Sequence, residues 1–370
     1  MATIYVDPLN GTDNADAGRG EGEGTSAYAS VGYAVSNYGS FSTTSGNVIY
    51  LADTSADVLS AQIANIGTIA APLLIEGYHY DGSNGGSAGT LTATGPFSTT
   101  IDPVGEIDGN DAVTQLFASL TYTTLKNLKL HSTTSNVLRG GAGTFAVNCE
   151  IYNGGGSYVQ RDMDLYACYV HNDTDLPINS FRSNVWFSEM KTCDVGLEMN
   201  EAIGGAFWSL IHDYNDAGIQ FSSDRIQVLG CTCDGTGSNA DSRGIQHSGD
   251  SAAHQGNSIL DTLITNHSGA TAIGIHTPTG AACMWRENIH VYNNTTNLSG
   301  PSAAWESTVT ETSNPYTDSA SDDFSLVSGA LSNAAATVSR DTANPDNVGA
   351  LQDNSSGGGG GGETTSVFMA

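Results

Sequence analysis

Basic residues are scarce in this chain of 370 residues. Lys and Arg number 11 against 39 Asp and Glu, which gives a formal net charge of −28, although only 14% of the residues are charged. The lysines, Lys126, Lys129 and Lys191, are too few to form a track for a phosphate backbone. Because so negative a field also repels anionic membrane surfaces, the composition excludes nucleic-acid binding and polybasic membrane adsorption.

Long hydrophobic runs and cysteine motifs are missing as well. No apolar stretch approaches the ~20 residues of a membrane span, so we expect no membrane insertion. The opening, Met-Ala-Thr-Ile-Tyr-Val-Asp, has neither the basic nor the apolar region of a secretory signal, so we expect no signal peptide. The 6 cysteines form neither a disulfide-dense pattern nor a zinc-binding spacing, and we expect them to be reduced and packed.

Glycine is abundant, at 45 residues, and part of it belongs to an internal repeat. Four segments read glycine, an aliphatic residue and then a polar or charged residue, and they begin at Gly196, Gly218, Gly244 and Gly274. Their spacings are 22, 26 and 30 residues. A period near 22 with two or three short strands per unit predicts the coils of a parallel β-helix.

Asn and Asp recur where these short strands end. Both residues tolerate the left-handed backbone of a sharp turn, so we predict coil corners at Asn153, Asp194, Asp216, Asn266 and Asn293. A β-propeller would need ~40–45 residues per blade, and a leucine-rich repeat would need a Leu/Asn consensus that is absent. An antiparallel sandwich gives no reason for Asn and Asp to recur in register.

Helical patterning is limited to one segment, residues 27–38. Its apolar residues recur at helical spacing, and they are Tyr28, Val31, Ala34, Val35 and Tyr38. Because the open hydrophobic end of a β-helix must be covered, we predict that this helix caps the N-terminal end.

The chain resembles the right-handed parallel β-helix proteins of the pectin-lyase-like superfamily. The resemblance rests on Ile4–Asp13, Asn47–Leu51, Pro72–Gly77 and the closing segment Asn314–Leu326. It implies an all-β, right-handed, single-stranded parallel β-helix with a short N-terminal capping helix and an irregular C-terminal closing segment. The expected divisions are an N-terminal strand and cap (1–46), the coils (47–300), the closing segment (301–351) and a glycine-rich tether with a terminal peptide (352–370).

Members of this superfamily commonly cleave polysaccharides, but the chain lacks their catalytic patterns. Uronate lyases of this fold use calcium with an Arg or Lys base, whereas the basic residues of the coils are dispersed here. The carboxylate pattern of the related hydrolases is missing, and the adjacent pair Asp322 and Asp323 falls outside the coils. No catalytic residue is predicted, and we expect a protein that is not an enzyme.

A polar ladder is predicted on one face of the coils. Each member follows an aliphatic residue expected to point inward, so the ladder itself should point outward: Glu198, Gln220, Gln246 and His276. Together with Trp208, Tyr214 and Trp285 this ladder could bind neutral sugars, and the alternative is an ordinary solvated face. The insertion at 235–254 is the expected source of binding specificity.

An acidic loop near the N-terminus is a candidate calcium site. Its carboxylates are Asp7, Asp13 and Asp16, and oxygen is the ligand atom that Ca²⁺ prefers. The spacing is not that of an EF-hand, so the alternative is a plain Asx-rich turn. No other cofactor is expected.

The end of the chain favours a role in assembly. Six glycines (357–362) precede a short apolar peptide, in which Val367, Phe368 and Met369 form a candidate anchor. These features resemble bacteriophage virion proteins such as tailspikes and decoration proteins. That resemblance implies a non-enzymatic, homo-oligomeric virion protein, assembled in the host cytoplasm, that contacts other virion subunits and host-surface polysaccharide. The alternatives are a polysaccharide lyase or glycoside hydrolase of the tailspike kind, and a bacterial surface adhesin.

Overall fold

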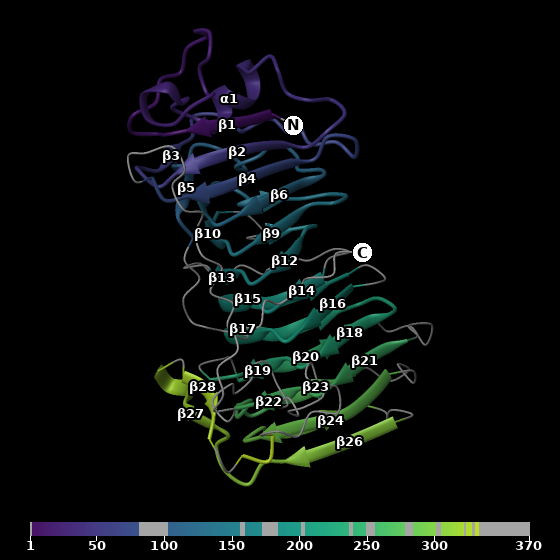
Figure 1. Ribbon diagram of the computed structural model, residues 1–370. Helices are drawn as coiled ribbons and strands as arrows, with labels where there is room; N and C mark the ends of the chain where they lie inside the picture. The colour runs from purple at the N-terminus through teal and green to yellow at the C-terminus, as the bar shows by residue number, and fades with distance from the viewer. Residues whose placement is uncertain are drawn as a thin grey trace, which may run out of the picture.

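Successive coils of the chain stack along one axis and pair through short parallel strands. Figure 1 shows the strands as rungs of one solenoid, so the predicted parallel β-helix is confirmed. The computed structural model describes residues 2–80, 103–155, 160–171, 184–200, 204–236, 240–248, 256–277, 284–300, 305–321, 323–327 and 330–332.

The longest stack, stack A, runs the length of the solenoid. Its inward side chains, such as Ile49, Ile75 and Leu125, are fully buried. Its strands are β1 (Ala2–Val6), β2 (Asn47–Ala52), β4 (Leu73–Tyr78), β6 (Thr123–Lys126), β9 (Phe145–Val147), β12 (Asp164–Tyr166), β14 (Asn184–Trp186), β16 (Gly204–Phe207), β18 (Ile226–Leu229), β21 (Asn257–Leu260) and the first parts of β24 (Met284–Tyr292) and β26 (Trp305–Thr310).

Stack B follows stack A along each coil, and Figure 1 shows the two side by side. Its inward residues include Ile107, Leu130 and Ile151, which are also fully buried. Its strands are β3 (Asp57–Val58), β5 (Gly105–Asp108), β7 (Leu128–Thr133), β10 (Glu150–Gly154), β13 (Tyr169–His171), the first parts of β15 (Glu189–Met199) and β17 (Leu210–Phe221), β19 (Thr232–Asp234), β22 (Leu263–Thr265) and the second parts of β24 and β26.

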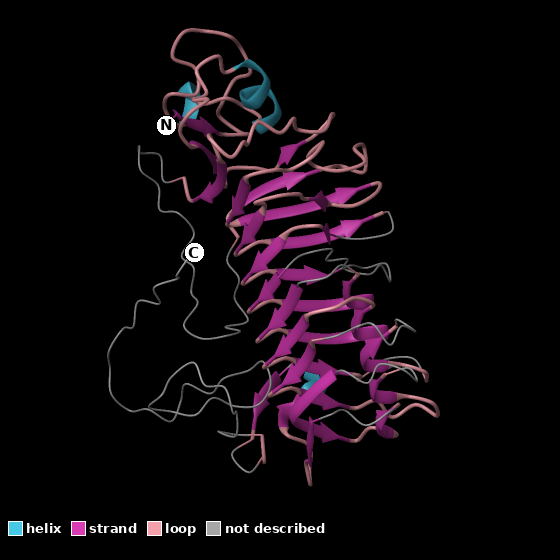
Figure 2. Ribbon diagram, turned by 90° about the vertical axis from the view of Figure 1, so that its right-hand side faces the viewer, coloured by secondary structure: helices cyan, strands magenta, loops and turns pink. Residues whose placement is uncertain are grey.

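Stack C completes the later coils. Figure 2 shows the solenoid from a second side, with strands again stacked along the axis. Stack C consists of the second parts of β15 and β17, followed by β20 (Arg243–His247), β23 (Ile273–His276) and β25 (Thr296–Ser299). A separate parallel pair is formed by β8 (Leu138–Arg139) and β11 (Gln160–Arg161).

From β6 to β24, each corner between stacks A and B is turned by one left-handed residue. These residues have φ between 46° and 64°, and they are Asn127, Asn148, Ala167, Phe187, Trp208, Gly230, Asp261 and Asn288. Neighbouring members also bond across coils: Asn148 Nδ2 donates to Asn127 Oδ1 at 2.8 Å, and Asn288 Nδ2 donates to Asp261 Oδ1 at 2.7 Å. The corner is therefore a side-chain ladder as well as a turn.

Left-handed residues also mark the corner between stacks B and C. The prediction is confirmed at three positions, Asn153, Asn266 and Asn293. Asp194 and Asp216 also lie at this corner, where the register of β15 and β17 shifts, but neither has left-handed backbone because the two strands continue through the corner. The left-handed residues of those two coils come earlier, at Thr192 and Asp213.

The glycines of the repeat lie where other groups come too close for a side chain. A Cβ atom on Gly218 would lie 2.9 Å from the ring of Tyr214, closer than non-bonded carbon atoms approach. Tyr214 is almost fully buried and belongs to the same strand, β17. At all four glycines of the repeat a Cβ atom would also lie 2.6–2.7 Å from a backbone carbonyl oxygen of the next coil, so the repeat reflects the close stacking of coils.

The two ends of the solenoid are built differently. Helix α1 (Val31–Asn37) covers the N-terminal end, as predicted, but it is shorter than expected because Tyr28 pairs with Val6 in a β-bridge. The short helix η1 (Gly24–Ser26) precedes it. After β26 the chain turns back, and β27 (Tyr316–Asp318), η2 (Ser319–Ser321) and β28 (Asp323–Leu326) lie beside β19 and β22. We call residues 311–332 the return segment.

The cysteines behave as expected where the structure describes them. Cys149, Cys168, Cys193, Cys231 and Cys233 are free thiols buried in the core. The described part of the chain contains no helix long and apolar enough to cross a membrane.

Replacing Gly230 by Ala tests the corner between stacks A and B. The added Cβ would lie 2.5 Å from Cδ1 of Trp208, at a residue whose φ is +64°. We expect the Gly230→Ala variant to lose about 1–3 kcal/mol of unfolding free energy in urea denaturation. The control is Gly32→Ala in α1, where the nearest atom to a new Cβ is 3.9 Å away, so its stability should be unchanged or higher. Equal stabilities of the two variants would contradict this account.

Candidate functional site

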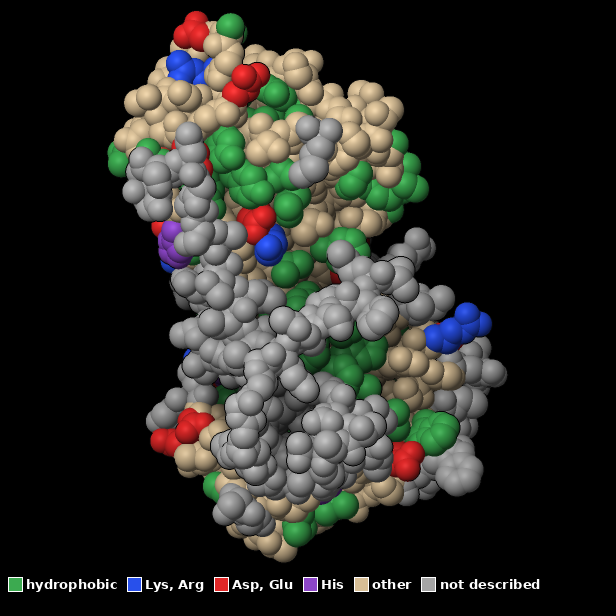
Figure 3. Space-filling model, viewed as in Figure 1, with side chains coloured by type: hydrophobic (Ala, Val, Ile, Leu, Met, Phe, Trp, Pro, Cys, Tyr) green, Lys and Arg blue, Asp and Glu red, His purple; other side chains and the backbone are tan. Residues whose placement is uncertain are grey.

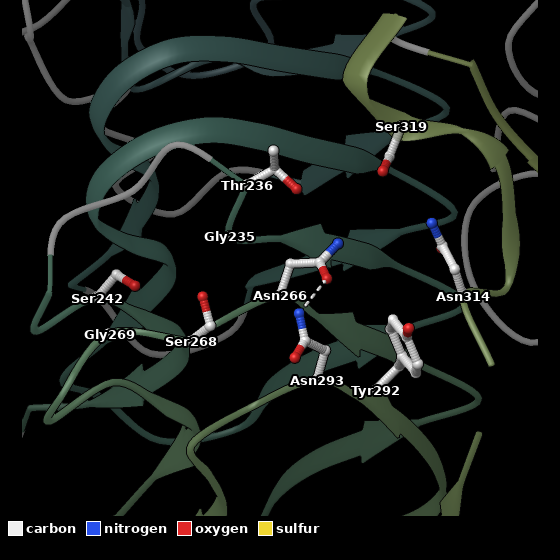
Figure 4. Close-up of a pocket in the computed structure, with 10 residues that line it drawn as sticks. All are labelled: Gly235, Thr236, Ser242, Asn266, Ser268, Gly269, Tyr292, Asn293, Asn314 and Ser319. Carbon is white, nitrogen blue, oxygen red and sulfur yellow. Dashed lines mark hydrogen bonds between the residues drawn. The ribbon is translucent and has the colours of Figure 1, made fainter. Parts of the chain in front are cut away.

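A pocket of about 400 Å³ lies at the corner between stacks B and C, in the later coils. Figure 4 shows that coil corners supply one part of its wall and the return segment supplies another. The lining residues are Gly235, Thr236, Ser242, Asn266, Ser268, Gly269, Tyr292, Asn293, Asn314 and Ser319.

The asparagines of the pocket are placed by the turns that they make. Asn266 and Asn293 follow β22 and β24 at adjacent coils, and both have left-handed backbone. Asn293 Nδ2 donates to Asn266 Oδ1 at 3.0 Å, and Asn266 Nδ2 donates to the buried Asp234 at 2.7 Å. These bonds hold the amide groups in a fixed orientation along the corner.

The return segment is fastened to stack B by buried polar contacts. The hydroxyl groups of Tyr316 and Thr265 lie 2.9 Å apart, and both residues are buried. Glu311 lies 2.9 Å from His290 Nδ1 and also accepts hydrogen bonds from the backbone N–H groups of Leu331 and Ser332. Because Asn314 lies between Glu311 and Tyr316 in the chain, these contacts also position its side of the pocket.

A charged cluster on stack B contacts the return segment at Phe324. His212 lies 3.0 Å from Glu189 and 3.2 Å from Asp213, and its ring contacts the ring of Phe324 at 4.8 Å. Burial by itself lowers the pKa of His212, but the hydrogen bonds to Asp213 and Glu189 outweigh it and raise the pKa to about 9. The hydrogen bond from His212 lowers the pKa of Asp213. His212 is therefore a cation at neutral pH.

The pocket itself is neutral. The lining residues that the structure describes carry amide groups, hydroxyl groups and one phenol ring, and none of them is charged. Its volume falls in the ~300–1,000 Å³ range of small-molecule sites. Such a lining offers both donors and acceptors to an uncharged, hydroxyl-rich ligand.

The predicted polar ladder exists in the register expected for it. Glu198 pairs with Gln220, Gln220 with Gln246, and Gln246 with His276 on stack C. The preceding aliphatic residues, Leu197, Ile219, Ile245 and Ile275, are fully buried. Burial, with a contribution from the charge of Arg243, lowers the pKa of His276, so its imidazole is neutral at pH 7. Sugar binding by this ladder stays a prediction.

The aromatic residues expected beside the ladder lie elsewhere. Tyr214 points into the core with 1% of its surface exposed, so its assignment to a glycan site is wrong. Trp208 lies at the corner between stacks A and B, where Phe187 stacks on it at 5.5 Å and Gly230 lies against the indole. Its ring is therefore not free to stack on a sugar. Trp285 is 48% exposed, on the outer face of stack A.

The acidic loop does not form one metal-binding group. Asp7 accepts hydrogen bonds from Asn10 and Thr54, Asp13 accepts from Ala29 and Ser30, and Asp16 accepts from Asn14. No group of three or more His, Cys, Asp or Glu side chains that could hold a metal ion occurs in the described ranges. Each of the three carboxylates therefore accepts hydrogen bonds from its own set of residues.

Part of the pocket lies in segments that the sequence singles out, and the rest does not. The insertion at 235–254 supplies Gly235, Thr236 and Ser242, whereas residues 237–239 and 249–255 lie outside the described residues. The recurrence of Asn and Asp at strand ends predicted the corner residues Asn266 and Asn293. Nothing in the sequence indicated Asn314 or Ser319. The anchor Val367, Phe368 and Met369 also lies outside the described residues.

Raising the pH should weaken the cluster around His212. Its folded pKa, about 9, exceeds the ordinary value of 6.5, so the stabilisation is complete below pH 6.5 and is lost as the pH rises toward 9. Between pH 6 and 9 the unfolding free energy of the wild type should fall by about 3 kcal/mol more than that of the His212→Gln variant. Denaturant titrations at both pH values measure this difference, and parallel pH profiles would contradict it.

Two solved structures are similar to this chain in fold. Pectate lyase Pel9A is similar with a TM-score of 0.53 and 10% identity, over 96% of this chain and 97% of that one. A GH136 lacto-N-biosidase from Eubacterium ramulus gives a TM-score of 0.39 and 10% identity, over 84% of this chain and 67% of that one. No family model and no curated protein matches the sequence. The fold is therefore a parallel β-helix of the pectate-lyase kind.

Proposed function

We propose that this protein binds neutral carbohydrate in the pocket between the coil corners and the return segment. The observation that carries the proposal is the uncharged, hydrogen-bonding lining of the pocket. Amide groups of Asn266, Asn293 and Asn314 provide donors and acceptors, which a sugar hydroxyl can match in both roles. The ring of Tyr292 adds an apolar surface for the C–H face of a sugar.

The charge distribution supports a neutral ligand over an anionic one. The net charge is −28, so a polymer of uronates would approach against a repulsive field. Basic side chains lie apart from one another on the face shown in Figure 3. Several basic residues of the described chain are paired with carboxylates: Lys126 with Glu76, Lys191 with Asp213, Arg243 with Asp216 and Arg19 with Asp16.

The outward ladder extends the proposal to a longer glycan. Glu198, Gln220, Gln246 and His276 form a polar column on stack C, and the pocket lies where the strands of stack C begin. A binding role in a virion, with partner subunits and self-association, receives no support from either structural comparison.

Polysaccharide cleavage is the second candidate, and the fold shared with pectate lyase Pel9A favours it. Incubation with polygalacturonate in the presence of calcium would release unsaturated products, measured by ultraviolet absorbance, if the protein were a lyase of that kind. Absence of these products alongside binding of neutral sugars would favour the binding role.

Isothermal titration with lactose, cellobiose, maltose and N,N′-diacetylchitobiose tests the binding proposal, with digalacturonate as the charged comparator. We expect at least one neutral disaccharide to bind and digalacturonate not to bind. Tyr292→Ala and Asn293→Gly should each raise the Kd about 10-fold, because each removes part of the lining. Glycine at position 293 keeps the left-handed backbone.

The matched control is Trp285→Ala, an exposed aromatic residue on the outer face of stack A. Its Kd for the same sugar should equal that of the wild type. The proposal is wrong if no neutral sugar binds, or if Trp285→Ala abolishes binding while Tyr292→Ala leaves it intact.

A further inference from the structure

A buried chain of hydrogen bonds runs from the core to the floor of the pocket. The hydroxyl of Tyr214 lies 3.0 Å from Nε2 of His267, and Nδ1 of His267 lies 3.3 Å from Oγ of Ser242. Ser242 is one of the residues that line the pocket. Tyr214 and His267 are at most 1% exposed, so this pair is protected from solvent, and Ser242, also 1% exposed, reaches only the inner wall of the pocket.

The direction of these hydrogen bonds follows from the environment of Tyr214. Its hydroxyl has no second acceptor among the described residues, and a buried O–H group without an acceptor is costly. Tyr214 O–H therefore donates to Nε2 of His267. Burial raises the pKa of Tyr214 well above its ordinary value, so the phenol keeps its proton.

His267 is then the tautomer that carries its hydrogen on Nδ1. Burial lowers the pKa of His267 to about 3, against a hydrogen bond with the backbone carbonyl of Cys233, so the imidazole is neutral above that pH. Since Nε2 accepts from Tyr214, the ring hydrogen is on Nδ1, which faces Ser242. The ring is confined, because a Cβ on Gly235 or Gly244 would lie 2.7 or 3.0 Å from its nitrogen atoms.

With its hydrogen on Nδ1, the ring offers Ser242 no acceptor at this contact, so the hydroxyl hydrogen of Ser242 points elsewhere. We propose that Tyr214 and His267 are positioning residues that direct the hydroxyl hydrogen of Ser242 into the pocket, where it donates to an oxygen atom of the bound sugar. This inference rests on the proposed function and adds to it a directed donor at the pocket floor. Such a donor selects ligands that present an acceptor at that point and rejects those that present only a donor.

The tautomer of His267 can be measured without any ligand. We expect ¹⁵N-histidine NMR of the full chain to show Nδ1 protonated and Nε2 unprotonated, with the signals assigned by their loss in a His267→Asn variant. In Tyr214→Phe, which removes the donor to Nε2, this preference should weaken or reverse. Protonation of Nε2 in the wild type would overturn the inference, because Ser242 would then be free to donate to Nδ1.

Binding of the same disaccharides provides the second measurement. Ser242→Ala and Tyr214→Phe should each raise the Kd about 3- to 10-fold, since each removes or misdirects one hydrogen bond to the ligand. The matched control is Tyr78→Phe, another buried tyrosine, whose hydroxyl has no hydrogen-bond partner within the described ranges, and its Kd should be unchanged. An unchanged Kd in both Ser242→Ala and Tyr214→Phe would also overturn the inference. If no disaccharide binds the wild type, the proposed function fails, whereas the NMR measurement still decides the direction of the hydrogen bonds.

Discussion

Each coil of this β-helix depends on meeting the coils above and below it in register. A strand of a few residues satisfies its backbone groups and buries its side chains only between neighbouring strands. The backbone conformation at the corners depends on that stacking. Trp208 adopts left-handed backbone although tryptophan gains nothing from it locally, because its indole then fits between the ring of Phe187 and the space left by Gly230. Corner geometry is thus set by what the neighbouring coil presents.

The pocket is a consequence of how the C-terminal end of the stack is completed. The chain turns back along the outer face of stack B, and this brings Asn314 and Ser319 opposite the coil corners. Two buried contacts with charged groups hold it there, through His212 below Phe324 and through Glu311 beside His290. The coils alone form only one wall of the pocket, and the return segment forms the other.

The repeat of glycine, aliphatic and polar residues predicted the fold and the register of the polar ladder, because stacking converts sequence period directly into adjacency. It did not predict which way Tyr214 points. Strand β17 bends through the corner between stacks B and C, so simple alternation fails there. The pocket was predictable at Asn266 and Asn293 and in the insertion at 235–254, whereas the contribution of Asn314 depends on a return path that no local pattern encodes. Likewise the carboxylates of Asp7, Asp13 and Asp16 are close in sequence, but each accepts hydrogen bonds from different residues, so they do not form the predicted calcium site.

The central claim is that a neutral glycan occupies the corner pocket and contacts both of its walls. Hydrogen–deuterium exchange of the full chain, with and without a saturating neutral disaccharide, tests this most directly. The account predicts slower exchange in residues 266–269, 292–294 and 314–319 together, because these segments line the pocket. Protection confined to the outer face of stack A, or no protection at any of the three segments, would contradict it.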